Sequence, residues 1–358
     1  MKTIFNNKLN KTIKKGGEAA MKIKLVLSII VVLSSVLALF PSVVSAADND
    51  NAIGTFGCKN AQPTVSSVAL VDLGGSGVTT MTPKIEYNVK VTVSDVNTLD
   101  DLTTVKVWIY WDEDGTFNSA NKVDPGDTQK GAIFTWTNAN PDTWAIDPTG
   151  GGTTWVLVTD NCTNPSLAGS NGVFQFHFKP GIVAKESAGL DSEWHIYAEA
   201  DDGTNPAASN YQENREMAWY GEIDLTTPTE VNWGDIDAGI DFGEPGSVNS
   251  SISVTYRANG NYSENVSATS PWSTTANLDP SGLTANANEF SLKADNDATL
   301  EDAALVTIYD TFTAIDETGI LTGETGNIEG TNSLWIRLSE TFVAGTYSGT
   351  IYYQIANR

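Results

Sequence analysis

Residues 85–93 read IEYNVKVTV and residues 105–111 read VKVWIYW, and these two stretches decide the fold. The first alternates strictly, with apolar side chains at every second position: Ile85, Tyr87, Val89, Val91 and Val93. The second repeats this alternation from Val105 to Trp111. Because successive side chains of an extended chain point to opposite faces, a period of two predicts a half-buried β-strand in both places.

The same signal recurs through the first half of the chain. We expect further strands at 65–71, 132–137, 154–159, 173–178 and 194–200. Between them lie runs rich in Gly, Asp and Pro, such as DLGGSG, DEDGT and DPTGGG, which are typical of turns. No segment after residue 46 has a convincing helical period. Seven short strands within about 150 residues predict a β-sandwich.

A second β-rich region follows a partly linker-like segment at 205–229, which holds one more expected strand at 217–223. Its expected strands lie at 251–257, 262–270, 289–293, 305–309, 334–338 and 346–355. The last of them, TYSGTIYYQI, alternates cleanly, and its edge must pair either within its own sheet or with a neighbouring molecule. We therefore predict an all-β chain with two sandwich domains, at 47–224 and 225–358.

The N-terminus has the order of a secretory signal peptide at 21–46. Lys22 and Lys24 precede the uncharged run LVLSIIVVLSSVLALF at 25–40, and small or modest side chains, Val44-Ser45-Ala46, follow. The run is shorter than the roughly 20 residues of a membrane span, so we expect cleavage after Ala46 rather than an uncleaved anchor. A processing site of the type IV pilin kind, at the Lys-Lys-Gly before the apolar run, is a further alternative.

Residues 1–20 fit this pattern poorly, because they make the positively charged region unusually long. Gly16-Gly17-Glu18 is compatible with a ribosome-binding sequence one short spacer before the codon for Met21. Our hypothesis is that translation starts at Met21 and that residues 1–20 are an extension outside the natural protein.

The chain is strongly acidic, with 44 acidic and 20 basic residues and a net charge of −24. Without residues 1–46 it loses seven Lys and one Glu, which leaves 13 basic and 43 acidic residues and a net charge of −30. Such a surface repels nucleic acid and anionic lipid. We predict no nucleic-acid partner and no transmembrane anchor in the mature chain.

Two cysteines and four sequons are the candidate sites of covalent modification. Cys58 and Cys162 are the only cysteines, and export would permit a disulfide between them. Four N-x-S/T sequons follow the signal peptide, and glycosylation depends on whether the source organism modifies exported proteins in this way. Their acceptor residues are Asn161, Asn249, Asn261 and Asn265.

Calcium is the one cofactor that the sequence suggests, since hard cations bind where several carboxylate oxygens converge. Asp112 and Asp114 alternate beside a glycine turn, and Asp201 and Asp202 form a second such pair. The spacing of an EF-hand is absent, and Asp-Gly is also ordinary hairpin chemistry. A plain turn is therefore the alternative at both places.

No catalytic constellation stands out. The chain lacks a G-x-S-x-G elbow, an H-E-x-x-H motif and a phosphate-binding loop. We expect His177 and His195 on the outer surfaces of strands, because each lies between apolar neighbours of a strand. Trp108, Trp136 and Trp144 are either packed residues or a platform for sugar stacking.

Two segments resemble known modules. WGDIDAG at 233–239, followed by DFG at 241–243 and SVTYRANG at 253–260, resembles the opening of immunoglobulin-like domains in secreted and envelope proteins. Residues 91–116 resemble immunoglobulin-like modules of archaeal cell-surface proteins. The resemblance implies two immunoglobulin-like β-sandwich domains in tandem after an N-terminal signal peptide helix, and it supports fold far more than function.

We expect a non-catalytic extracellular or cell-surface protein with a structural or adhesive role in an envelope layer, filament or surface complex. Its partners would be other envelope proteins, copies of itself or surface polysaccharide. A secreted carbohydrate- or ligand-binding module is the alternative, and a secreted hydrolase is a third reading. An open sheet edge at the C-terminal strand would favour assembly by strand addition.

Overall fold

The computed structural model describes residues 55–122, 129–147, 155–187, 193–226, 229–244, 247–279, 281, 286–295, 305–319 and 328–358. The chain divides between Cys58 and Lys59 into two units, which we describe separately. The predicted signal peptide and the predicted extension at 1–20 lie outside the described residues. Of the first unit, Thr55–Cys58 is described, and this segment is exposed and has no regular secondary structure.

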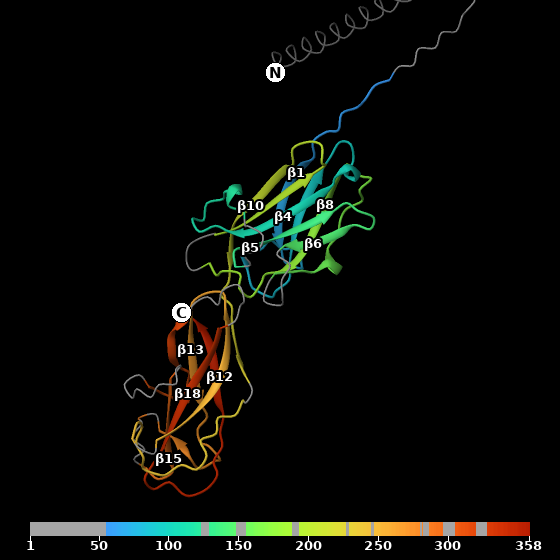
Figure 1. The fold of residues 1–358 in the computed structure, drawn as a ribbon. Helices are drawn as coiled ribbons and strands as arrows, with labels where there is room; N and C mark the ends of the chain where they lie inside the picture. The colour runs from blue at the N-terminus through green and yellow to red at the C-terminus, as the bar shows by residue number, and fades with distance from the viewer. Residues whose placement is uncertain are drawn as a thin grey trace, which may run out of the picture. The chain divides into compact units, whose positions relative to one another are not determined.

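The second unit begins with an immunoglobulin-like sandwich (Figure 1). One sheet has the strand order β1 (Thr64–Val71), β3 (Tyr87–Ser94), β8 (Asn171–Lys179) and β7 (Val156–Leu157). The facing sheet has the order β2 (Thr80–Met81), β10 (Ala208–Met217), β9 (Trp194–Asp201), β4 (Thr104–Trp111), β5 (Gly131–Thr137) and β6 (Thr143–Asp147). This is the strand order of a variable-type immunoglobulin domain, in which two additional strands extend the second sheet.

The predicted alternation forms the core of this sandwich. Val89, Val91 and Val93 of β3 are fully buried, and the inward-facing residues of β4 lie opposite them. Ile85 departs from the prediction, because β3 begins only at Tyr87 and Ile85 is 53% exposed. The backbone N–H of Ile85 donates to the carbonyl of Thr82. This hydrogen bond closes a turn, so Ile85 belongs to the turn and not to the strand.

A second sandwich follows. One sheet has the order β11 (Gly221–Leu225), β12 (Val248–Ala258), β18 (Ile328–Leu338), β15 (Glu289–Asp295) and β14 (Asn277–Leu278), and β16 (Val306–Thr307) also pairs with β15. The facing sheet has three strands in the order β17 (Thr313–Gly319), β13 (Tyr262–Ala268) and β19 (Ile351–Asn357). Apolar residues of both sheets form a separate core between them.

Helices are minor in the described part of the chain. Three short 3₁₀ helices occur there, η1 (Leu99–Asp101), η2 (Ser119–Asn121) and η3 (Thr159–Asn161). Among the same residues, no helix has the length and apolar character needed to cross a bilayer. The chain is therefore all-β where it is described, as the alternation predicts.

Strand β10 lies within the segment 205–229, which we predicted from the sequence to be partly a linker. Two of its inward-facing positions, between Ala208 and Met217 of the core, carry amides in place of apolar side chains, so no alternation is visible. The side chain of Asn210 donates to the carbonyl of Val65 at 3.0 Å, and Gln212 accepts from the N–H of Leu70 at 2.8 Å. These side chains bond the backbone of β1 across the sandwich, and this explains how a polar strand is held in place.

The ends of two strands also differ from expectation. All of β11 pairs with β12, so residues 221–224, which we assigned to the first domain, are hydrogen-bonded into the second sandwich. The predicted division between 224 and 225 falls inside this strand. The strand expected at 346–355 begins only at Ile351. The two-domain division remains a proposal, now placed before Gly221.

Candidate functional site

The C-terminal strand β19 has one edge without a ladder partner, which we call its open edge, although its C-terminal end lies against β11, where a Cβ on Gly221 would be 3.3 Å from the Ile355 side chain. It pairs with β13 from Ala268 opposite Ile351 to Tyr262 opposite Asn357, and it pairs with no second strand among the described residues. In the first sandwich the corresponding central strand β9 is flanked on both sides, by β4 and β10. In its described part, the second sandwich therefore has no equivalent of β10, the strand that pairs with β9 on this side of the first sandwich.

The open edge continues upstream of β19. Thr269 donates its N–H to the carbonyl of Thr350 at 2.9 Å, and Ser273 does the same to Ser348 at 3.0 Å. These bonds fix one side of the segment 346–350 in an extended course. Its other side borders a groove.

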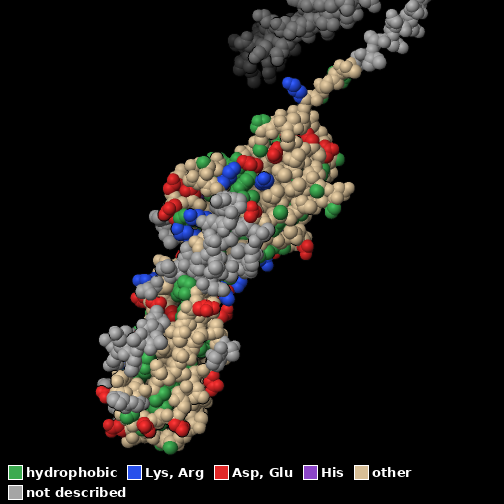
Figure 2. All heavy atoms as spheres, viewed as in Figure 1, with side chains coloured by type: hydrophobic (Ala, Val, Ile, Leu, Met, Phe, Trp, Pro, Cys, Tyr) green, Lys and Arg blue, Asp and Glu red, His purple; other side chains and the backbone are tan. Residues whose placement is uncertain are grey.

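The groove has a volume of about 920 Å³. We call it the β19 groove. Its walls come from the loops at 229–238 and 342–350 and from the inner faces of both sheets. The apolar residues that line it include Trp233, Ile252, Trp272, Phe290, Ile336, Phe342, Tyr347, Ile351 and Tyr353. Figure 2 shows hydrophobic side chains on the visible face of the second sandwich, with carboxylates around them.

The charged residues of the groove are all acidic. Its lining contains Glu230, Asp235 and Asp237 but no Lys, Arg or His. An occupant that combines apolar side chains with a basic residue would therefore be complementary to it.

Two buried donors of the groove lack an acceptor. The Nε1–H of Trp272 and the hydroxyl of Tyr353 are buried, and neither has a hydrogen-bond partner in the described structure. Both residues line the groove. Most buried polar atoms in proteins are hydrogen-bonded. Two donors without an acceptor in one groove therefore indicate a place where the backbone carbonyl groups of a bound chain could accept their hydrogen bonds.

Gly349 shapes the floor of the groove. A Cβ at this position would overlap the indole of Trp272, so only glycine allows the extended segment to approach the ring.

We predict that Gly349→Ala destabilises the second sandwich by about 1–3 kcal/mol, the usual result of overpacking. The measurement is the free energy of unfolding in urea. Gly77→Ala is the matched control, because no atom lies within 4 Å of a Cβ there. An equal stability for the two variants would contradict the close packing.

A second candidate surface lies on the outer face of the first sandwich. Three aromatic residues follow one another across β4, β9 and β10, because Trp108 pairs with Tyr197 and Tyr197 with Tyr211. The loop after β4 covers them: Phe117 stacks on Tyr211 at 3.7 Å, and the Lys122 ammonium lies 4.4 Å from the Trp108 ring and 4.2 Å from the Tyr197 ring. We call these five residues the outer aromatic cluster.

His195 contradicts our expectation of an exposed strand residue. It is fully buried, and neither ring nitrogen has a hydrogen-bond partner in the described structure. The rings of Tyr110 and Phe117 cover it, at centroid distances of 5.5 and 5.7 Å. Burial lowers the pKa of His195, and the nearby carboxylate of Asp112 opposes this effect. His177 is partly exposed and lies 3.0 Å from Glu86.

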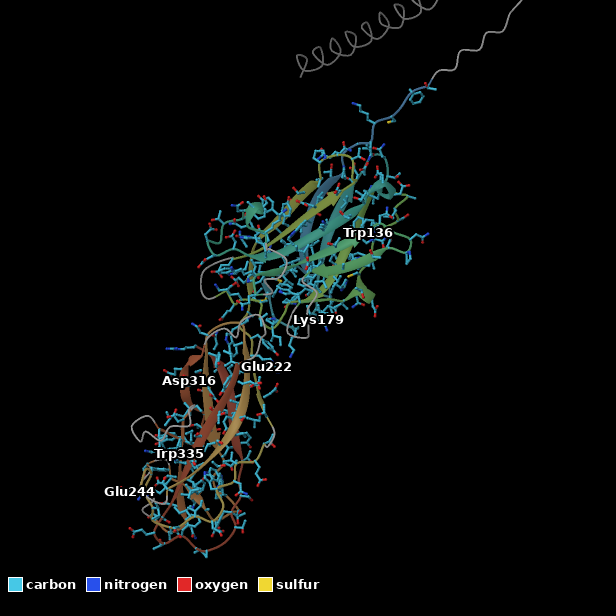
Figure 3. All side chains as sticks on the ribbon, viewed as in Figure 1. Trp136, Lys179, Glu222, Glu244, Asp316 and Trp335 are labelled. Atoms are coloured by element: carbon cyan, nitrogen blue, oxygen red, sulfur yellow. The ribbon has the colours of Figure 1, made fainter. Side chains whose placement is uncertain are left out.

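The other tryptophans are part of the core. Trp136 is fully buried among the strands of the first sandwich (Figure 3) and packs on Phe174 at 4.8 Å. Trp144 is half-buried against the same core. Of the three tryptophans considered for sugar stacking, Trp108 is the one on the outer face.

The four predicted calcium residues do not meet at one point. Asp112 follows the end of β4, whereas the register of β4 with β9 places Asp201 at the other end, about 26 Å away. All four carboxylates accept local hydrogen bonds, from Asn121, Thr116, Gly203 and Thr204 respectively. Within the described ranges, no three His, Cys, Asp or Glu side chains form a metal site. Calcium binding remains a prediction.

The predicted disulfide partners lie in different units of the chain. Cys162 is half-buried beside η3, where its Sγ contacts the carbonyl of Val158 at 3.5 Å and accepts the N–H of His177 at 3.3 Å. Burial raises the pKa of the Cys162 thiol to about 11, so it is a poor nucleophile at neutral pH. Pairing with Cys58 remains a prediction.

The four sequons occupy different settings. Asn161, Asn249 and Asn261 are exposed, and the Asn161 amide donates to Glu86 at 2.7 Å. Asn265 lies in the middle of β13, between β17 and β19, and is partly buried. If the protein is glycosylated, we expect the three exposed sites to be modified in preference to Asn265.

One titratable group is buried inside the second sandwich. Glu264 of β13 is 1% exposed and contacts Asn332 of β18, which in turn lies 3.3 Å from the Tyr256 hydroxyl. Burial raises the pKa of Glu264 to about 7, although hydrogen bonds from Tyr256 and Asn332 act in the opposite direction. The sequence carries no sign of this group, because it lies within an ordinary alternating strand.

No family model and no curated protein matches the chain. Among solved structures, it is similar to a C-terminal fragment of the major pilin GBS80 of Streptococcus agalactiae (10% identity, TM-score 0.21, covering 76% of this chain and 79% of that one). It is also similar to a chaperone–tip adhesion subunit complex from Csu pili of Acinetobacter baumannii (8% identity, TM-score 0.27, covering 81% of this chain and 99% of that one). A third similar structure is the CupB6 tip adhesin from Pseudomonas aeruginosa (9% identity, TM-score 0.21, covering 82% of this chain and 93% of that one). At these TM-scores the similarities carry no conclusion about function.

Proposed function

We propose that this chain is an exported, non-catalytic subunit of a cell-surface assembly with a structural or adhesive role. The observation that carries the proposal is the open edge of β19 beside the β19 groove. An unpaired edge offers a row of backbone N–H and C=O groups, and natural proteins normally cover such an edge or use it for pairing with another chain. The acidic surface keeps the subunit soluble until it meets its partner.

The proposal is tested on the mature chain, residues 47–358, by size-exclusion chromatography with light scattering and by electron microscopy. We expect mass to increase with concentration. Val343→Glu places a charge at the groove and should shift assembly to higher concentration. Val343 is 57% exposed, so this variant should still fold.

Val96→Glu on the first sandwich is the matched control, because Val96 is 83% exposed and lies outside the groove. A chain that remains monomeric at every concentration would contradict the proposal. Parallel runs with and without Ca²⁺ test the calcium prediction, and unchanged assembly and stability would remove it.

A carbohydrate-binding module is the second candidate function. The outer aromatic cluster supports it, because the ring of Trp108 on the outer sheet surface could stack on a sugar ring once the covering Lys122 side chain moves away from it. Retention of the mature chain on immobilised polysaccharide is the measurement. Trp108→Ala should abolish retention while leaving assembly intact, and wild-type protein that is not retained would remove this candidate.

A further inference from the structure

Two buried carboxylate oxygens in the loop between β3 and β4 have no hydrogen-bond partner. Asp95 is 2% exposed, and its Oδ2 atom accepts no hydrogen bond within the described part of the chain. The same holds for the buried Oδ1 atom of Asp101. Because a carboxylate oxygen that leaves water without gaining a partner carries a large desolvation cost, the two atoms indicate a place for a positively charged group.

A third carboxylate lies beside this pair. The backbone N–H of Thr103 donates to the carbonyl of Asp201 at 2.7 Å, which brings the end of the loop to the end of β9. Asp202, the next residue of the chain, is 6% exposed. Burial raises the pKa of Asp101, and the negative charges of Asp95 and Asp202 raise it further. The three carboxylates therefore act on one another at one end of the first sandwich.

The side-chain amide of Asn60 contacts two of these carboxylates. Its Nδ2 donates to Oδ2 of Asp202 at 3.1 Å, and its hydrogen bond to Asp101 lowers the pKa of that carboxyl group. Asp202 keeps other donors, because its Oδ2 also accepts from Asn205 at 2.8 Å and its Oδ1 accepts from backbone N–H groups. A half-turn of the Asn60 amide would place its oxygen where the nitrogen lies and leave Asp202 hydrogen-bonded.

We propose that Asp95, Asp101 and Asn60 bind a calcium ion at this end of the first sandwich. The ligand atoms are Oδ2 of Asp95, Oδ1 of Asp101 and Oδ1 of the turned Asn60 amide, and water completes the roughly six to eight oxygens that Ca²⁺ takes. Only two acidic ligands belong to this set, so it agrees with the finding that no three acidic, His or Cys side chains of the described chain form a metal site. Asp202 adds a negative charge nearby, without the Asp201 partner that the sequence suggested.

The ion would attach the start of the sandwich to this loop. Asn60 lies just before β1, and the N–H of the next residue, Ala61, already donates to the side chain of Asn97 at 2.6 Å. The Asn97 N–H in turn donates to Oδ1 of Asp95 at 2.8 Å. Calcium would add a direct link between Asn60 and Asp95, and it should therefore stabilise the first sandwich. None of these residues lines the β19 groove, so the site goes beyond the proposed assembly.

The experiment is a calorimetric titration of the mature chain with Ca²⁺, at physiological salt to screen nonspecific attraction to the acidic surface. We expect one site with a dissociation constant of about 0.1–1 mM, the range of extracellular calcium modules. Asp95→Asn and Asp101→Asn should each weaken binding about tenfold or more, because each removes a charged ligand. Asp114→Asn is the matched control, since it removes the same charge at an exposed position of the loop after β4, and it should bind as wild type does.

Thermal unfolding gives a second measurement that a purely structural role of Asp95 would not reproduce. In chelator, Asp95→Asn should melt at or above the temperature of wild type, because it removes a buried charge and keeps Oδ1 for the Asn97 N–H. Ca²⁺ should raise the melting temperature of wild type and leave that of Asp95→Asn nearly unchanged. A variant that melts below wild type in chelator and still responds fully to Ca²⁺ would contradict the proposal.

Other outcomes would also overturn the site. A response to Ca²⁺ that Mg²⁺ reproduces, and that all three variants retain, would reflect screening of the acidic surface. Loss of the response in Asp114→Asn but not in Asp95→Asn would place calcium in the loop after β4. The absence of any response in wild type would remove calcium altogether. Assembly of the chain is measured separately, so none of these results decides the proposed function.

Discussion

Replacing Glu264 with Gln is expected to stabilise the second sandwich at pH 8 and to leave it nearly unchanged at pH 4. Glu264 is 1% exposed, and burial raises its pKa from 4.5 to about 7. Below pH 4.5 the carboxyl group is protonated in both the folded and the unfolded chain, and it imposes no penalty. Gln has the same shape and can keep the hydrogen bond with Asn332.

The sign follows from proton linkage. Between pH 4.5 and 7 the unfolded chain releases the proton while the folded chain retains it, so stability falls as the pH rises. Above pH 7 the folded chain carries a buried charge, and the full loss is about 3 kcal/mol. Glu264→Gln removes this loss, so its advantage over wild type should grow from near zero at pH 4 to about that value.

Urea unfolding of the mature chain at several pH values is the measurement, with hydrogen exchange in β12, β13 and β18 reporting the second sandwich. Glu329→Gln, on an exposed position of β18, is the control and should show no such change. A stability difference between Glu264→Gln and wild type that does not depend on pH would contradict the account of this group.

Trp136→Ala is expected to destabilise the first sandwich by about 3–5 kcal/mol, the usual range for a large aromatic residue lost from a core. Trp136 is fully buried and packs on Phe174. Trp108→Ala should change stability by about 1 kcal/mol or less, since Trp108 mainly loses contacts with Tyr197 and Lys122 on the outer face. Thermal and urea unfolding of both variants provide the comparison. Equal losses would show that Trp108 is also a core residue and would weaken its role as a binding surface.

The sequence predicted the parts of the fold that alternation encodes. β1, β3, β4, β5, β8 and β9 lie close to their expected positions because apolar residues at every second place form their inner faces. β10 was hidden, since Asn210 and Gln212 face inward and bond the backbone of β1. The expected domain division fell inside β11, because the pairing of this strand with β12 is identified only by hydrogen bonding.

The candidate site was predictable only in outline. The alternation of 346–355 indicated a terminal strand with an edge to be covered, but the sequence does not say which edge stays open. The β19 groove depends on the spacing between two sheets and on the contact of Gly349 with Trp272. Likewise, His195 looked like a surface residue, because a period of two cannot reveal that Phe117 and Tyr110 cover it.

Hydrogen–deuterium exchange of β19 and the segment before it tests the central claim most directly. The mature chain is compared below and above the concentration at which it assembles. If assembly uses the open edge, amides in 346–353 become protected on assembly, and Val343→Glu removes this protection at the same concentration. Protection confined to the first sandwich, with 346–353 exchanging as fast in the assembly as in the monomer, would contradict the account.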